Sequence, residues 1–106
     1  MHIVKEIQTM SEKVIIMVSH SIDSFVTTDM ELANKTIKAD DEVDDLFISI
    51  RNRIVELIKS EHCSGEVAVD ALMIVKYLER IADHAVNICE WVEFFKTGEY
   101  KNTRII

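Results

Sequence analysis

The chain of 106 residues combines 48% hydrophobic with 29% charged residues, which is the composition of a folded globular domain and excludes a disordered one. It contains no proline and only two glycines, Gly65 and Gly98. A β-rich domain of this length needs many tight turns, so an all-α fold of few, long helices is expected. The formal net charge of −7 disfavours nucleic acid and anionic membrane as partners, and it favours metal cations or basic protein surfaces.

The two cysteines, Cys63 and Cys89, show no metal-binding spacing. Cys89 falls on an apolar helix face and Cys63 in a predicted turn, so free thiols in a reducing cytoplasm are expected rather than a disulfide. No apolar run approaches the length of a membrane span, and the N-terminus lacks the apolar core of a secretion signal. We therefore expect one cytoplasmic domain over residues 1–106, in contact with a membrane only through partner proteins.

Residues 3–25 are predicted to form the first long amphipathic helix. Its apolar residues recur every three or four positions, and Ser21 fills one gap in that stripe. The stripe consists of Ile3, Ile7, Met10, Val14, Met17 and Phe25. Thr28 is followed three residues later by Glu31, which is the pattern of a capping box, so a short helix over residues 29–38 is expected next.

The acidic run DDEVDD at residues 40–45 predicts the start of another helix. Asp40 is a favourable N-cap residue, and acidic side chains in a first turn complement the helix dipole. We therefore expect the middle helix to be broken near Ala39 and Asp40 and to continue to about Lys59. Its predicted core residues are Val43, Phe47, Ile50, Ile54, Leu57 and Ile58.

Residues 60–65 are predicted to form a turn, with Ser64 as the N-cap of the third helix. That helix ends near Gly98, which suits the position after a helix C-terminus. Its apolar stripe contains Leu78, Ala82, Ala85, Cys89 and Val92, widened by Ile81, Ile88 and Phe95. Residues 99–106 are expected to be loose or extended. Three long helices with short connections predict an up-down-up three-helix bundle.

A second stripe on the third helix is polar. Glu79, Asp83 and Asn87 recur at every fourth residue, which stacks two carboxylates and an amide on one side of the helix. Like charges at this spacing repel each other and do not help the helix to form. Something else must favour them: a cation, a basic partner, or water.

The acidic run contains the same spacing in Asp40 and Asp44. When two antiparallel helices are joined by a short turn here, residues at equal height have numbers that sum to roughly 125. Asp40 and Asp44 then lie nearly level with Glu79 and Asp83, so four carboxylates converge. Oxygen ligands suit Mg, Mn, Ca or Fe ions, so these four residues are predicted metal ligands. Two alternatives remain: a solvated, capped helix start, or an ion pair of Arg80 with Asp44.

Catalytic patterns are missing from the sequence. There is no nucleophile with a base in range, no glycine-rich phosphate loop and no Glu-x-x-His motif of a di-iron bundle. His84 stands beside Asp83, but a lone histidine on a helix flank is more often structural. The aromatic residues near the end of the third helix are expected to form core or a docking surface; they are Trp91, Phe94, Phe95 and Tyr100.

Two motifs carry a resemblance to a known family. The run ERIADHAVNICEWV at residues 79–92 resembles the signature of the PhoU family, typically E-R-I-G-D followed by N-I-x-E. The segment from Asp29 to Asp44 resembles the companion D-x-x-x-D motif of that family. Both motifs occur in the expected order, and the similarity covers about residues 5–103. The family's glycine is replaced by Ala82, which is one departure from the pattern.

The resemblance implies a three-helix bundle that is normally duplicated in tandem, and a regulator rather than an enzyme. Such proteins act as negative regulators of phosphate uptake and phosphate signalling, between a phosphate ABC transporter and a sensor histidine kinase. Asp40, Asp44, Glu79 and Asp83 match the family's metal-binding motifs, which implies divalent or iron-type ions as cofactors. Only one repeat is present, so the chain is either one half of a duplicated protein or a single-repeat member that pairs with a copy of itself. Self-association, for example as a homodimer, is expected.

Other functions remain open at this stage. A PhoU-like bundle also serves as the cytoplasmic domain of sodium/phosphate cotransporters and other transporters. A metal-dependent hydrolase is less favoured, because a shallow patch between two helices offers neither a closed site nor an acid or base to move protons. A helical interaction module without metal is the third possibility.

Overall fold

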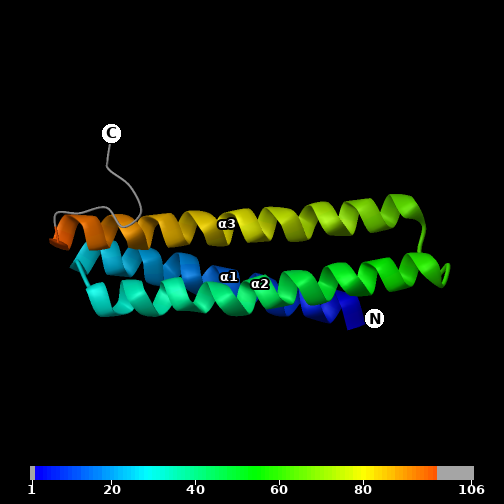
Figure 1. The fold of residues 1–106 in the computed structure, drawn as a ribbon, viewed down its shortest axis with the longest axis horizontal. Coiled ribbons are helices and arrows are strands. Elements are labelled where there is room, and N and C mark those ends of the chain that lie inside the picture. Colours follow the sequence, from blue (N-terminus) through cyan, green and yellow to red (C-terminus); the bar gives the residue numbers. More distant parts are fainter. Residues whose placement is uncertain (1, 98–106) are drawn as a thin grey trace.

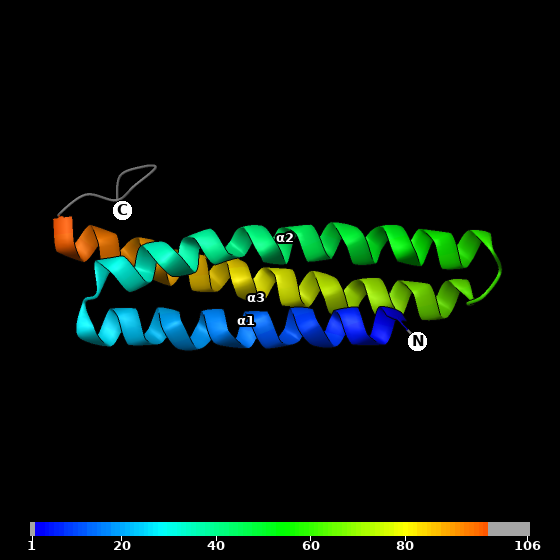
Figure 2. The same cartoon turned by 90° about the horizontal axis from the view of Figure 1, so that it is seen from below.

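The computed structural model describes residues 2–97, which form three α-helices: α1 (His2–Thr27), α2 (Met30–Lys59) and α3 (Gly65–Thr97). The helices run up, down and up and lie side by side in an elongated bundle whose Cα trace measures 53 × 25 × 16 Å (Figures 1 and 2). The predicted all-α three-helix bundle is confirmed. None of these three helices combines the length and the hydropathy of a membrane span.

The predicted break of the middle helix near Ala39 and Asp40 is wrong, because α2 is one continuous helix. Its buried residues step by three, four or seven positions across the expected break, so nothing in the packing requires a change of direction; they are Ala33, Thr36, Val43, Ile50 and Ile54. Asp40 lies four residues after Thr36 and three before Val43, in phase with this stripe. It is therefore an interior helical residue and not an N-cap.

The true start of α2 lies one residue after the predicted capping threonine. The side chain of Asp29 caps the helix by accepting a hydrogen bond of 3.0 Å from the backbone nitrogen of Leu32. Thr28 instead adopts a left-handed backbone conformation, with φ of 52°, that turns the chain from α1 into α2. The capping box predicted the position of the helix start but assigned the cap to the wrong residue.

The turn between α2 and α3 follows the sequence prediction. The Ser64 hydroxyl accepts a hydrogen bond of 3.1 Å from the backbone nitrogen of Val67, which confirms Ser64 as the capping residue of α3. Glu61 has φ of 60° and reverses the chain within this turn. The predicted stop at Gly98 and the loose segment 99–106 lie outside the described residues.

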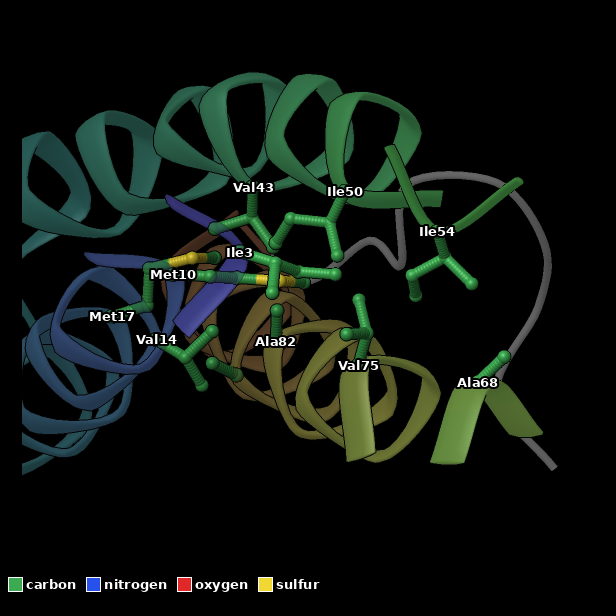
Figure 3. Close-up of a cluster of buried hydrophobic side chains, with 11 residues drawn as sticks. Ile3, Met10, Val14, Met17, Val43, Ile50, Ile54, Ala68, Val75 and Ala82 are labelled. Carbon is green, nitrogen blue, oxygen red and sulfur yellow. The ribbon is translucent and has the colours of Figure 1, made fainter. Parts of the chain in front are cut away.

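All three helices contribute to the main core (Figure 3). Most of the predicted stripe positions are buried in it. The buried residues are Ile3, Met10, Val14, Met17, Val43, Ile50, Ile54, Ala68, Val75, Ala82 and Ala85. Four predicted stripe residues are wrong, because they are between 43% and 62% exposed: Phe25, Ile58, Ile81 and Phe95. Near the end of α1, Ser24 takes the buried position instead of Phe25.

Three buried hydroxyl groups continue the core toward the α1–α2 turn. The side chains of Ser21, Ser24 and Thr36 each donate a hydrogen bond of 2.8 Å to a carbonyl oxygen of their own helix. These bonds remove most of the cost of burying a hydroxyl group.

A smaller apolar cluster contains Cys89. Both cysteines are free thiols, as predicted.

Candidate functional site

The structure brings the two pairs of carboxylates together on the face between α2 and α3. The pKa of Asp40 is raised in part by the negative charges of Asp83 and Glu79 on the opposite helix. The pKa of Asp44 is raised in part by the same two residues. The four side chains, which we call the carboxylate patch, therefore lie within range of one another's charges. The antiparallel register inferred from the sequence leads to the same grouping.

Asp40 is the most perturbed member of the carboxylate patch. Burial raises its pKa to about 6, and the nearby charges of Asp44 and Asp83 add to that effect. Its Oδ1 atom is buried, and no described residue offers it a hydrogen bond. An ionised carboxylate with a buried, unpartnered oxygen is destabilising, so this group favours either a proton or a cation.

Asp44 lies one helical turn further along α2 and is partly exposed. Burial is again the largest cause of its raised pKa, followed by the charges of Glu79 and Asp83. On α3, the side chain of Glu79 is 24% exposed and Asp83 lies at the surface. Three members of the patch are therefore half-buried, and Asp83 alone among the four is exposed.

One lysine partly offsets the charge of the carboxylate patch. Nζ of Lys76 lies 3.5 Å from Oε1 of Glu79 and 5.2 Å from the ring centroid of Phe47 on α2. The alternative in which Arg80 pairs with Asp44 is not observed, because the Arg80 guanidinium lies over the ring of Tyr77 at 5.8 Å. This ion pair could have been predicted from the sequence. Lys76 lies three residues before Glu79, and that spacing places the two side chains on one face of the helix.

The patch is not a preorganised metal centre. Within residues 2–97, no three histidine, cysteine, aspartate or glutamate side chains are placed so that they could hold a metal ion. The carboxylates thus interact through their charges without forming a coordination shell. Their role as metal ligands stays a prediction. Asn87 and His84, on the same part of α3, are exposed.

The aromatic residues gather at the opposite end of α3 from its cap. Trp91 lies 5.5 Å from Phe94 and 5.9 Å from Phe95, measured between ring centroids. The ring centroid of Phe95 also lies 6.0 Å from that of Phe25 on α1. These rings therefore contact one another outside the core rather than within it. Tyr100, the fourth predicted member, lies outside the described residues.

The fold and the carboxylate patch define a class of protein: a three-helix bundle with an acidic face between its second and third helices. The chain belongs to the PhoU family: the PhoU domain matches residues 7–92. The resemblance inferred from the two sequence motifs is therefore confirmed.

The curated relatives are named as accessory proteins of a phosphate-specific transport system. The chain is 35% identical over 97 residues to the phosphate-specific transport system accessory protein PhoU homolog of Clostridium acetobutylicum. It is 36% identical over 95 residues to the corresponding homolog 1 of Thermotoga maritima. These matches cover 92% and 90% of this chain but 44% and 41% of the relatives, so the chain spans less than half of their length. No solved structure matches the chain.

The raised pKa of Asp40 predicts that stability falls as the pH rises from about 4 to about 6. The folded-state pKa is about 6 against an ordinary value of 3.8, so in this range the folded protein holds the proton that the unfolded chain has lost. Replacing Asp40→Asn should flatten this slope. Above pH 6 the variant should exceed the wild type in stability by on the order of 1 kcal/mol, a figure reduced for solvent screening of a partly exposed group.

The measurement is urea unfolding followed by circular dichroism in metal-free buffers from pH 4 to pH 7.5. Asp70→Asn serves as the control, since Asp70 is an exposed aspartate of α3 away from the patch. Parallel profiles for the wild type and Asp40→Asn would contradict the prediction.

Proposed function

We propose that this chain is a regulatory accessory domain of phosphate uptake and phosphate signalling that acts through protein contacts. The observation that supports this most is the PhoU domain over residues 7–92, together with relatives named as accessory proteins of phosphate-specific transport systems. The partners proposed are a phosphate ABC transporter and a sensor histidine kinase. The domain would work on the cytoplasmic side of the membrane and reach it through these partners.

We also propose that the carboxylate patch binds a divalent or iron-type ion. Two observations support a cation. One is the raised pKa of Asp40 and Asp44, caused first by burial and then by the repulsion between the carboxylates. The other is the buried, unpartnered Oδ1 atom of Asp40. Carboxylate oxygens are the ligands that hard cations prefer. Because the side chains are not preorganised, water or a second protein surface would complete the coordination shell, and the affinity would be modest. The same lack of a closed shell disfavours a metal-dependent hydrolase.

Self-association through the face between α1 and α3 is the third part of the proposal. This face carries large apolar side chains along both helices that are between 43% and 74% exposed: Val4, Ile15, Ile22, Val26, Ile74 and Ile81. Between the helices lies a hollow of about 350 Å³ whose lining contains no charged residue.

Charge favours this face over the others for contact with a second copy. In a twofold dimer the same patch of each copy meets the other, so like charges in the patch repel. On a chain with a net charge of −7, a face whose central hollow is lined by uncharged residues reduces that penalty. Even the narrower long side of the bundle, 53 by 16 Å at the Cα level, has a projected area slightly above the roughly 800 Å² that each partner contributes to a standard interface.

The regulatory role predicts the effect of deleting the gene in its own host. In phosphate-replete medium, loss of a negative regulator should raise phosphate uptake and the expression of phosphate-starvation genes, and a plasmid copy should restore both. Radiolabelled phosphate uptake and a promoter reporter measure these effects. Unchanged uptake would count against the role. So would metal-stimulated phosphatase turnover by the purified chain that disappears in Asp44→Asn.

The metal proposal predicts that a divalent transition metal raises the melting temperature of the wild type. An ion present at ten times its Kd adds about 1.4 kcal/mol, which corresponds to roughly 5–10 °C for a domain of this size. The shift should be much smaller in Glu79→Gln/Asp83→Asn. Without metal this variant should be at least as stable as the wild type, because it loses mainly repulsion. Equal metal shifts in both proteins would show that these carboxylates form a solvated or protein-binding face.

The self-association proposal predicts a dimer that Ile15→Glu or Ile81→Glu dissociates, since each places a charge in the uncharged face. Ile48→Glu is the matched control: Ile48 is 52% exposed but belongs to α2, so this change should leave the dimer intact. Sedimentation velocity over a range of concentrations measures the species present. A wild type that stays monomeric at high concentration would refute the proposal.

A further inference from the structure

The third face of the bundle, between α1 and α2, has a chemistry different from the other two. Two hollows of about 190 and 260 Å³ lie along it, and we call them together the α1–α2 groove. Five basic side chains line the groove: Lys5, Lys13, His20, Lys35 and Arg53. They come from the helices α1 and α2.

The acidic residues that line this groove are already paired. Oε2 of Glu42 lies 2.7 Å from Nζ of Lys13. Glu6 forms an ion pair with Arg53, and it also accepts a hydrogen bond of 3.0 Å from the hydroxyl of Ser49. The negative charge of the groove is thus neutralised within it.

Three basic side chains of the groove remain without such a partner. Among the described residues, no side chain forms an ion pair or a hydrogen bond with the ammonium groups of Lys5 and Lys35 or with the His20 ring. Asp23 and Glu31, each near one end of a helix, are outside the lining. On a chain with a net charge of −7, this groove therefore holds an excess of positive charge.

The floor of the groove is apolar. Met17 is buried at its base, and Ala39 and Leu46 of α2 are half-buried. Ile16 is 53% exposed and stands in the wall. An apolar floor between basic rims is complementary to a helix that has apolar residues on one side and acidic residues along their flanks.

We infer that the α1–α2 groove is a docking site for an acidic amphipathic helix of a partner protein. From Lys5 to His20 the groove follows about 22 Å of α1, which matches about four turns of a bound helix. The carboxylates of the partner lie against Lys5, Lys35 and His20, and its apolar side chains pack on the floor. This inference extends the proposed accessory role by assigning one surface to partner contact and by stating the chemistry of that partner.

The test uses a fluorescein-labelled peptide of sixteen residues, with leucine at helical spacing and glutamate at the flanking positions. Its counterpart has lysine in place of every glutamate. Fluorescence anisotropy should show saturable binding of the glutamate peptide that is weakened by salt. The lysine peptide should not bind in the groove, although the acidic face between α2 and α3 can attract it. Amide chemical-shift changes should map to α1 and α2 along the groove.

Charge reversal on the rim distinguishes the groove from the rest of the surface. Lys35→Glu/His20→Glu should weaken binding of the glutamate peptide about tenfold or more, a change of at least about 1.4 kcal/mol. The control Lys96→Glu/His84→Glu makes the same residue changes at exposed positions of α3 and should have little effect. Circular dichroism checks that all variants remain helical.

Several results would overturn the inference. Equal shift changes in the groove from the two peptides, equal weakening by the control variant, or shift changes from the glutamate peptide on another face would each do so. A change in oligomeric state caused by Lys35→Glu/His20→Glu alone would identify a second copy of the chain as the occupant instead. The peptide assay contains no transporter, so a negative result in it would contradict the docking site and leave the proposed regulatory role standing. The uptake experiment tests that role.

Discussion

The antiparallel contact between α2 and α3 is the constraint on which the arrangement of this protein depends. Both helices rise by the same amount per residue, so one short turn at residues 60–64 sets the height of every pair along their length. Lys76 over Phe47, and Glu79 beside Asp44, both reflect this register. A shift by one helical turn would move the two pairs of carboxylates out of level with each other by about 5.4 Å.

This contact also explains why Asp40 is unusual. Its position is in phase with the buried stripe of α2, between Thr36 and Val43, where most helices carry an apolar residue. The side chain reaches the edge of the core and meets the acids of α3 there, so burial and repulsion act together on its pKa. A bound cation would relieve the unfavourable energy of this buried and repelled carboxylate. This relief is the physical basis of the proposed cation site.

Each helix has one stripe of residues that faces the core and two flanks beside it, so the bundle has three grooves. The residues on the flanks give each groove a different chemistry. The face between α2 and α3 is acidic, the face between α1 and α2 is basic along its rim, and the face between α1 and α3 is apolar. The proposals made above assign one occupant to each face: a cation, an acidic partner helix and a second copy of the chain. Because the three faces are separate, these occupants would not compete for one site.

The amino-acid sequence by itself determined the three helices, the cap at Ser64 and the two pairs of carboxylates. These features are local, since they depend on hydrophobic spacing and on side chains that bond to nearby backbone groups. The constant rise of antiparallel helices was enough to place the pairs on one face. The family was recognisable for the same reason, because its motifs are continuous stretches on single helices.

Only the tertiary structure decided whether α2 breaks at Asp40. An aspartate there satisfies the local rules for an N-cap. The buried residues before and after it lie in two clusters that both contain residues of α3, and burying both segments keeps the helix continuous. The same holds for Phe25 and Phe95, which follow the helical period but lie on each other outside the core. Periodicity states which side of a helix is apolar, whereas burial depends on where the neighbouring helices lie.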